Sequence, residues 1–319
     1  MITEVTDLTA KILVCDPIEP DGIKMLRDAG YQVDEQPKIT PIELNAKISE
    51  YEGVVVRGRT KITREVVQGG RKLKVIARSG VGLDNIDIQA AKEKGIQIVS
   101  TPAAPSTSVA ELAVSLMLAV LRQISYSDKA MKDGKWIKSQ LIGRELKDKT
   151  VGVVGAGGRI GLSVASAVKN GFGAKVVGYD VIDIKEKAAK IGFEVTEKLE
   201  DLLEKSDIIT VHVPYLPSTH HLIDERMLTK MKGGAILVNT SRADIVDGKA
   251  MLRALKNGRL SGVGLDVFHN EPPKEEWEKE LVSNSQAICT CHVGAQTREA
   301  QKLESIMVAE QIIALFGKS

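Results

Sequence analysis

Side chains able to bind an organic acid and to move a proton occur in segments that follow runs of apolar residues. Arginine offers a rigid fork of donors to a carboxylate, and histidine has the side-chain pKa nearest neutrality. Ligands bind at the carboxyl ends of parallel strands, so we expect these segments to meet at one rim of a sheet. The segments are Asn239–Asp244 with Arg242, Leu265–Pro273 with Asp266 and Glu271, and Thr290–Ala295 with His292.

A glycine-rich loop follows another apolar run, within Val151–Gly161. Glycines permit a tight turn and a close approach of the backbone to a pyrophosphate, whose charge is bound by N–H groups at the start of a helix. This context predicts a dinucleotide site built on Gly155, Gly157 and Gly161. The spacing has one residue more than the usual Gly-x-Gly-x-x-Gly, and the alternative is a glycine-rich helix start that binds no ligand.

Asp180 ends the next apolar run, about 20 residues after the glycine loop. At this place in a dinucleotide-binding unit, an acidic side chain accepts hydrogen bonds from the adenosine ribose. Its charge would repel a 2′-phosphate, so we expect NAD to be preferred to NADP. The alternative is that Asp180 caps the helix that follows.

Short Val- and Ile-rich runs alternate with amphipathic helical segments along the whole chain, which is the pattern of parallel strands joined by right-handed crossovers. Six strands in the second half are the number expected of a doubly wound dinucleotide domain. We therefore predict an α/β fold of two doubly wound parallel-sheet domains, one flavodoxin-like and one Rossmann, with a cleft between them. The expected strands are Ile12–Cys15, Gln32–Asp34, Gly53–Val56, Val75–Arg78, Ile96–Val99, Val151–Val154, Lys175–Tyr179, Ile208–Val213, Ala235–Asn239, Gly262–Val267 and Ala287–Thr290.

One predicted helix is longer than the others. It runs from Ser108 to Lys132, and its Val109–Leu121 stretch is apolar on most faces. Such a helix is either central to one domain or buried against a second subunit. A crossover helix rarely needs to be apolar all round, so we expect a homodimer that uses helix 108–132 and its flanking loop.

Composition excludes several classes of protein. Hydrophobic residues make up 43% and charged residues 27% of the chain, which disfavours a disordered protein. A net charge of +2 and an aromatic content of 3% argue against a nucleic-acid partner. Cysteines 15, 289 and 291 are too few for a disulfide framework, and the most apolar stretch is too short for a bilayer. We expect a cytoplasmic protein with no membrane partner.

The chain resembles the D-isomer-specific 2-hydroxyacid dehydrogenases over essentially its whole length. Within that family it is most similar to the D-3-phosphoglycerate dehydrogenases, through Arg57, Arg78 and Lys132–Trp136. The resemblance implies NAD-dependent oxidation of D-3-phosphoglycerate to 3-phosphohydroxypyruvate, a step of L-serine biosynthesis. Besides the glycine loop and the rim segments, it rests on Val55–Lys61, Ala77–Asn85 and Met131–Trp136.

The same resemblance implies roles that the side-chain chemistry supports. Arg242 would bind the substrate carboxylate and carbonyl oxygen, His292 would be the general acid/base, and Glu271 would bind the other ring nitrogen and favour the imidazolium. Asp266 would support the nicotinamide end of the cofactor or the same proton network. Substrate binding would fall, besides Arg242 and His292, to Arg57, Arg78, Ser79, Gly80 and Val81.

The resemblance further implies a discontinuous substrate-binding domain, residues 1–103 plus 296–319, bracketing an NAD-binding Rossmann domain of residues 104–295. Lys138 is implied to reach the active site of the partner in a dimer. With Val81 of the first domain, the implied cofactor-binding residues are Gly155, Gly157, Gly158, Arg159, Ile160, Gly161, Asp180, His212, Val213, Pro214, Thr240, Ser241, Arg242, Asp266, His292, Gly294 and Ala295.

Alternatives stay open at this point. One is a glyoxylate or hydroxypyruvate reductase of the same family. It differs from a phosphoglycerate dehydrogenase in whether Arg57 and Arg78 bind a phosphate on the substrate. Another, of a different class, is an NAD-sensing, corepressor-like binding protein, which measurable turnover would exclude. The run Cys289-x-Cys291-His292 superficially resembles a metal cluster, but it lacks a second pair and we expect no metal. We also expect His269 to be a solvated loop residue, and the chain to lack the regulatory extension of many phosphoglycerate dehydrogenases.

Overall fold

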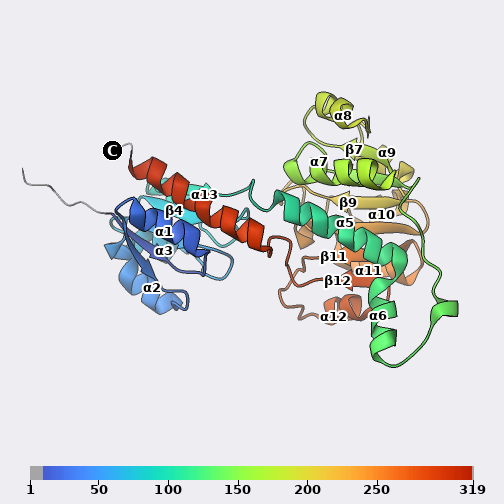
Figure 1. Ribbon diagram of the computed structural model, residues 1–319, viewed down its shortest axis with the longest axis horizontal. Helices are drawn as coiled ribbons and strands as arrows, with labels where there is room; N and C mark the ends of the chain where they lie inside the picture. Colours follow the sequence, from blue (N-terminus) through green and yellow to red (C-terminus); the bar gives the residue numbers. More distant parts are fainter. Residues whose placement is uncertain (1–9, 318–319) are drawn as a thin grey trace, which may run out of the picture. The chain divides into compact units, whose positions relative to one another are not determined.

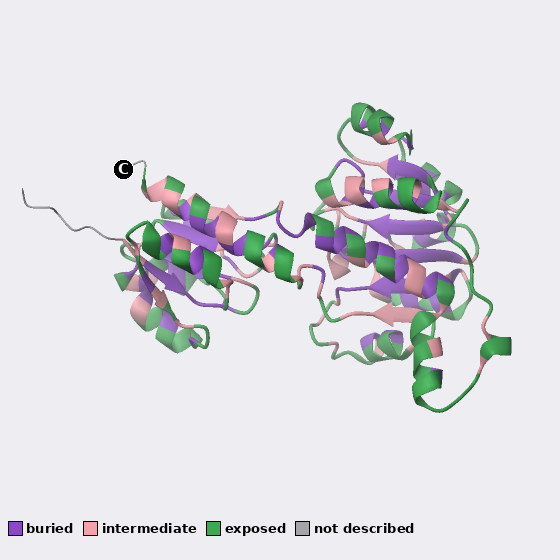
Figure 2. Ribbon diagram, in the orientation of Figure 1, coloured by how far each residue is buried: buried purple, intermediate pink, exposed green. Residues whose placement is uncertain are grey.

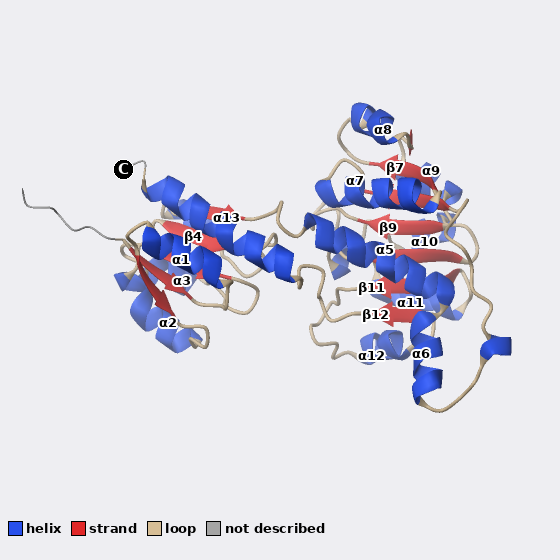
Figure 3. Cartoon of the chain, viewed as in Figure 1, coloured by secondary structure: helices blue, strands red, loops and turns tan. Residues whose placement is uncertain are grey.

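The computed structural model describes residues 10–317, which form two compact units (Figure 1). Unit 1 combines the described residues up to Pro105 with those from Ala295 onward, and unit 2 comprises Ser106–Gly294. Each unit is a parallel sheet covered by helices (Figure 3). The predicted α/β class with two parallel-sheet domains is thereby confirmed.

Within its described residues, unit 1 contains a five-stranded parallel sheet in the order β2-β1-β3-β4-β5, which is the flavodoxin-like order. Arg78 is in register with Val56 on one side and Ser100 on the other, so three neighbouring strands end together. The elements of unit 1 are β1 (Lys11–Val14), α1 (Pro20–Asp28), β2 (Gln32–Glu35), α2 (Pro41–Lys47), η1 (Ile48–Glu50), β3 (Gly53–Val56), α3 (Arg64–Gly69), β4 (Val75–Arg78), α4 (Ile88–Glu93), β5 (Gln97–Ser100) and α13 (Arg298–Phe316).

Alternation of side chains along each strand builds a core on both faces of this sheet. Leu13 packs with residues of α2, α3 and α4, whereas its neighbours Ile12 and Val14 pack with α1 and α13. The last helix joins the first because Gly22 of α1 has no side chain, and its N–H donates to Ser305 Oγ of α13 at 3.2 Å. This close approach explains why the end of the chain belongs to unit 1.

Among the described residues, unit 2 contains a seven-stranded parallel sheet in the order β12-β11-β10-β9-β6-β7-β8. The order reverses between β6 and β9, as in a Rossmann domain. Its elements are α5 (Ser106–Arg122), α6 (Ile124–Lys132), η2 (Lys138–Gln140), β6 (Thr150–Val154), α7 (Arg159–Ser166), η3 (Ala167–Gly171), β7 (Lys175–Tyr179), α8 (Lys185–Ile191), β8 (Glu194–Val195), α9 (Leu199–Lys205), β9 (Ile208–Val211), α10 (Glu225–Lys230), β10 (Ala235–Asn239), η4 (Ala243–Ile245), α11 (Gly248–Lys256), β11 (Leu260–Leu265), α12 (Glu276–Ser283) and β12 (Ala287–Cys289).

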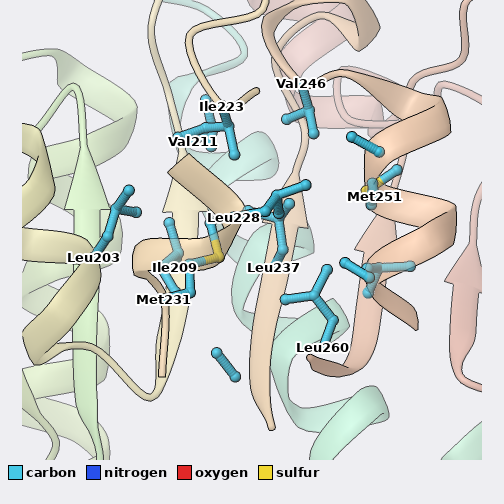
Figure 4. Close-up of a cluster of buried hydrophobic side chains, with 14 of the residues drawn as sticks. Leu203, Ile209, Val211, Ile223, Leu228, Met231, Leu237, Val246, Met251 and Leu260 are labelled. Carbon is cyan, nitrogen blue, oxygen red and sulfur yellow. The ribbon is translucent and has the colours of Figure 1, made fainter. Parts of the chain in front are cut away.

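Helices cover both faces of the second sheet, and the buried residues concentrate on its strands (Figure 2). On one face Ile209 and Leu237 pack with residues of α9, α10 and α11, among them Leu203, Leu228 and Met251 (Figure 4). The opposite face packs against α5 and α7. The alternation that was used to predict the strands therefore also determines which helix each strand contacts.

The predicted single helix 108–132 is wrong. The chain breaks at Gln123, which adopts a left-handed backbone with φ 52°, and the helices on either side, α5 and α6, are bent by 67°. The Gln123 side chain donates to the Ile142 carbonyl at 3.1 Å, which helps to hold the break. The apolar stretch of α5 packs inside its own domain, since Leu116 contacts Gly264 of β11 within unit 2. This is the first of the two alternatives, a helix central to one domain.

Among the described residues no single helix is long and apolar enough to cross a membrane, and α5 and α6 reach that length and composition only when they are taken together. Several strand ends also differ from the prediction. β9 ends at Val211 and β11 at Leu265, so His212 and Asp266 lie just beyond their strands. The short strand β8 was not predicted, and α13 begins two residues later than expected because Thr297 caps it.

Candidate active site

The turn between β6 and α7 leaves no room for a side chain at Gly155 or Gly161. Gly155 has φ +87°, and a Cβ there would lie 2.7 Å from the His212 carbonyl oxygen. A Cβ on Gly161 would collide with the carbonyl of Gly155. The Gly158 N–H donates to the Gly155 carbonyl at 3.2 Å, so the loop with its additional residue is still a tight turn leading into α7. Such a turn exposes the backbone to a pyrophosphate.

Asp180, directly after β7, folds over the same turn. Its Oδ2 accepts the Gly157 N–H at 2.8 Å, and its Oδ1 accepts the Ile182 N–H at 3.4 Å. A Cβ on Gly157 would stand 2.9 Å from that Oδ2, so the glycine lets the carboxylate reach the loop. Asp180 does not cap the next helix, whose N-cap residue is Ile184. Its contact with a ribose stays a prediction.

His212 opens the segment after β9 that is expected, with Val213 and Pro214, to touch the cofactor. Its Nε2 hydrogen-bonds Thr210 Oγ1 at 2.8 Å, and among the described residues its Nδ1 has no partner. Burial lowers the pKa of the ring to about 3, so the imidazole is neutral near pH 7. Because the ring stays neutral, we do not assign it a role in proton transfer. The contact of this segment with the glycine loop is made by the backbone, where the His212 carbonyl lies beside Gly155.

The turn after β10 carries Thr240, Ser241 and Arg242 and is shaped by Asn239. The buried Asn239 side chain accepts the Ser241 N–H at 2.9 Å and donates to the Arg242 carbonyl at 2.8 Å. Ser241 Oγ donates to the Val211 carbonyl of β9 at 2.9 Å, which ties the turn to the neighbouring strand. The sequence reasoning did not single out Asn239, although it fixes the backbone that presents the predicted substrate-binding arginine.

Glu271 and His292 form a hydrogen-bonded pair. His292 Nδ1 lies 2.8 Å from Oε2 and 3.0 Å from Oε1 of the Glu271 carboxylate, and the two side chains are 48% and 41% exposed. The hydrogen bond that the ring donates to Glu271 raises the pKa of the imidazole above its usual value, against partial burial and the nearby Arg242. Partial burial would raise the pKa of Glu271, but the bond to His292 holds it below its usual value. The pair therefore favours an imidazolium next to a carboxylate.

Asp266 binds a side-chain hydroxyl before His292 and two backbone N–H groups after it. It is 1% exposed, and its carboxylate accepts Thr290 Oγ1 at 2.6 Å and the N–H groups of Val293 and Gly294 at 2.8 Å. His292 has φ +53°, a left-handed backbone that costs a residue with a side chain some energy. Of the two roles expected for Asp266, this geometry fits support of the proton network.

In unit 1, Arg57 and Arg78 stand at the ends of β3 and β4. The Arg57 backbone N–H donates to the buried Asp16 carboxylate at 2.6 Å, and its guanidinium lies 3.5 Å from Glu304. The Arg78 Nε donates to the Gly82 carbonyl at 3.0 Å. Both arginines are thus held in place, and phosphate binding by them stays a prediction.

The loop after β4, which is expected to bind substrate, is held in place by its own backbone, and the Ser79 N–H donates to the Val56 carbonyl at 2.9 Å. Ser79 is buried, Gly80 has φ +130°, and a Cβ on Gly80 would collide with the Arg78 guanidinium. The Gly80 N–H donates to Thr101 Oγ1 at 2.8 Å, and the Val81 side chain is 43% exposed. A residue other than glycine at position 80 would displace the arginine.

Other singled-out residues are placed as follows. His269 is exposed, yet its Nδ1 lies 2.8 Å from the Asp244 carboxylate, so it is more than a solvated loop residue. Cys291 is exposed and Cys289 is half-buried in β12, where burial raises the pKa of its thiol to about 11. In residues 10–317, no group of three His, Cys, Asp or Glu side chains is arranged to hold a metal ion.

Buried acids were missed by the sequence reasoning, and some could have been found. Glu278 stands three residues after Glu275, the spacing of a capping box. Glu304 lies four residues from both Ala300 and Val308, the buried face of α13, so the helical period pointed to its burial. Burial raises the pKa of Glu304 above its usual value.

Comparison with known proteins places these observations in one family. Residues 114–294 match the family described as "D-isomer specific 2-hydroxyacid dehydrogenase, NAD binding domain". A D-3-phosphoglycerate dehydrogenase of Methanocaldococcus jannaschii is 45% identical over 302 residues, which are 95% of this chain and 56% of that protein. A hydroxypyruvate reductase of Thermotoga maritima is 39% identical over 307 residues, 96% of this chain and 98% of that protein.

Among solved structures, D-lactate dehydrogenase from Aquifex aeolicus, complexed with NAD and lactic acid, has a TM-score of 0.84 and 30% identity, over 97% of this chain and 96% of that one. The chain spans about half the length of the phosphoglycerate dehydrogenases that it matches. It spans nearly all of the hydroxypyruvate reductase.

Proposed function

The chain belongs to the D-isomer-specific 2-hydroxyacid dehydrogenase family, and from this premise we propose that it oxidises D-3-phosphoglycerate to 3-phosphohydroxypyruvate with NAD, a step of serine biosynthesis. The observation that carries the proposal is the His292–Glu271 pair, which gives a proton acceptor for the substrate hydroxyl. The similarity to D-3-phosphoglycerate dehydrogenases directs the choice of substrate.

The glycine turn fits a dinucleotide, because Gly155 and Gly161 have no room for a Cβ and the turn leads into the N-terminus of α7. When bound, NAD supplies the acceptor for the hydride that leaves C2 of the substrate. Asp180 would bind the adenosine ribose. Further contacts would come from Val81, Gly157, Gly158, Arg159, Ile160, His212, Val213, Pro214, Thr240, Ser241, Arg242, Asp266, His292, Gly294 and Ala295.

His292 would move the substrate proton. Its Nδ1 is held by Glu271, so Nε2, on the other side of the ring, would accept the hydroxyl proton as the C2–O bond becomes a carbonyl. The resulting imidazolium is stabilised by the Glu271 carboxylate, which raises the pKa of His292. In the reverse direction, the protonated ring would donate to the carbonyl oxygen.

Arginines would bind the remaining charges of the substrate. Arg242 is a permanent cation with a planar fork of donors, which suits the carboxylate and the carbonyl oxygen. Arg57 and Arg78 of unit 1 would bind the phosphate, and the backbone of Ser79–Val81 would bind the carboxylate. The buried Glu304, 3.5 Å from Arg57, would keep that guanidinium in place.

A second candidate is the reduction of hydroxypyruvate or glyoxylate. It is favoured by the hydroxypyruvate reductase of Thermotoga maritima, whose length this chain spans almost completely. The chemistry at His292 would be the same in the reverse direction, so the two candidates differ in whether a phosphate on the substrate matters. Arg57 and Arg78 are the residues that would give the enzyme a preference for a phosphorylated substrate.

A homodimer is part of the proposal. On α6 and the segment after it, Ile124, Met131, Trp136 and Ile142 are 54–84% exposed. A group of large apolar side chains on one surface segment favours a subunit interface. Lys138 follows Trp136 and would extend toward the active site of the second copy. Light scattering on a sizing column would give the mass of two chains, and Trp136→Glu would reduce it to one.

NADH formation or consumption, followed spectrophotometrically, tests the substrate. D-3-phosphoglycerate should give a higher kcat/KM than D-glycerate or D-lactate, and 3-phosphohydroxypyruvate a higher one than hydroxypyruvate. Arg57→Ala should remove the advantage of the phosphorylated substrates and leave the others nearly unchanged. Equal kcat/KM with and without phosphate would overturn the phosphoglycerate assignment in favour of the second candidate. Turnover of none of these acids would overturn both.

A further inference from the structure

The segment that connects β11 to α12 carries Glu271 but forms no regular element over residues 266–275. Besides its bonds to His292, the Glu271 carboxylate accepts the Phe268 N–H at 3.2 Å. An irregular loop needs contacts of its own to keep one side chain within hydrogen-bonding distance of a residue on another segment. Those contacts come from Glu278.

Glu278 lies in the first turn of α12 and is 1% exposed. Its Oε1 accepts the Asn270 N–H at 2.7 Å. Its Oε2 accepts the Asn270 side-chain amide at 3.0 Å and the N–H groups of Lys274 and Glu275 at 2.9 Å. Burial alone would raise the pKa of this carboxyl, but the hydrogen bonds lower it to about 2, so it is ionised at neutral pH.

The donors to Glu278 flank Glu271 on both sides. Asn270 immediately precedes Glu271, and Lys274 carries the first N–H after Pro272 and Pro273, which cannot donate. One buried carboxylate therefore joins the two ends of a short segment whose middle is the partner of His292. If those bonds are lost, Phe268 and His269 still anchor the segment before Glu271, but Asn270 and Lys274, on either side of Glu271, lose their bonds to the buried carboxylate.

We propose that Glu278 is a positioning residue for the acid–base pair: by binding the chain on both sides of Glu271, it holds that carboxylate against His292. Among the described residues, the charges that shift the pKa of His292 belong to Glu271 in the same loop, Asp266 after β11 and Arg242 after β10. Glu278 is outside this set, so a change at Glu278 reaches His292 through the position of Glu271. The kinetic arm of the test rests on the proposed function.

Glu278→Gln is the test variant, because it keeps the side-chain length and removes one acceptor atom. A carboxamide presents N–H groups where Oε1 or Oε2 now accepts hydrogen bonds, so donors of the segment are left facing donors. Glu276→Gln is the matched control, since Glu276 is an exposed acid in the same turn of α12. Glu271→Gln gives the pKa of His292 that is expected when its carboxylate partner is removed.

The primary measurement is the pKa of His292 from an NMR titration of the protein without substrate or cofactor. The chain has five histidines, so the spectrum of His292→Asn assigns the resonance. Glu278→Gln should lower the pKa of His292 toward the value in Glu271→Gln, Glu276→Gln should leave it at the wild-type value, and the double variant at 271 and 278 should show no further decrease. An unchanged pKa in Glu278→Gln, with a decrease in Glu271→Gln, would overturn the proposal.

The kinetic arm follows oxidation of the preferred hydroxy acid. Glu278→Gln should lower kcat roughly 10- to 100-fold, the effect of a misplaced catalytic group, with little change in KM. A loss confined to thermal stability would contradict a positioning role. Should wild type have no such activity, the proposed function fails while the titration still decides the role of Glu278. Should Glu278→Gln not fold, Asn270→Ala removes one donor to Glu278 and should lower the pKa of His292 by a smaller amount; no decrease would overturn the proposal.

Discussion

Replacing Asp266 with alanine should destabilise unit 2, because it removes the carboxylate that binds the backbone around His292. That buried carboxylate accepts hydrogen bonds from Thr290, Val293 and Gly294 at 2.6–2.8 Å. A hydrogen bond to a charged group contributes roughly 1.5–3 kcal/mol, and bonds within one network do not add fully. The Gly294 N–H is buried and the other two donors are partly accessible. We therefore expect the free energy of unfolding to fall by about 3–5 kcal/mol.

Tryptophan fluorescence during denaturant unfolding measures this loss, because both tryptophans of the chain, Trp136 and Trp277, belong to unit 2. The midpoint of thermal unfolding should fall by roughly 6–20 °C for a unit of this size. Asp266→Asn keeps one acceptor oxygen and should lose less. Asp201→Ala, at an exposed position of α9, is the control and should change stability by at most about 0.5 kcal/mol. A loss below about 1 kcal/mol in Asp266→Ala would refute the reasoning.

Three further substitutions test individual contacts. Glu271→Gln should move the acidic limb of the oxidation profile to lower pH, because the carboxylate that raises the pKa of His292 is lost; a limb that stays in place contradicts the pairing. Asp180→Ala should reduce the preference for NAD over NADP, measured as the ratio of kcat/KM, and an unchanged ratio counts against a ribose contact. Gly155→Ala should weaken NADH binding at least tenfold in a fluorescence titration, since its Cβ would lie 2.7 Å from the His212 carbonyl; affinity within about twofold of wild type would show that the turn tolerates a side chain.

Most of the fold could be predicted because apolar periodicity is a local signal. Strands β3, β4, β7 and β10 have the predicted bounds, and each is a continuous apolar run between polar ends. β8 could not be predicted, since its two residues, Glu194 and Val195, are too few to carry a period. The break at Gln123 also lacked a signal, because a left-handed backbone at a glutamine is marked by neither glycine nor proline.

The candidate site also contains residues that the sequence could predict and residues that it could not. The order of Arg242, Glu271 and His292 after successive strands could be predicted, since strand ends are visible in the sequence. The contacts of Asp266, and those of Glu278 with Asn270 and Lys274, could not be assigned, because they involve backbone N–H groups of irregular segments. Where those groups lie is decided by the tertiary structure, so no spacing in the chain reveals it.

The pH dependence of kcat/KM in both directions tests the role of His292 most directly. Oxidation requires the neutral ring and reduction requires the protonated ring, so the oxidation rate should rise and the reduction rate fall as pH passes through the pKa of His292, which Glu271 raises above its usual value. His292→Asn should lower both rates roughly 10²- to 10⁴-fold and remove the opposed trends. Parallel pH profiles in the two directions, under conditions where the chemical step limits the rate, would contradict the account.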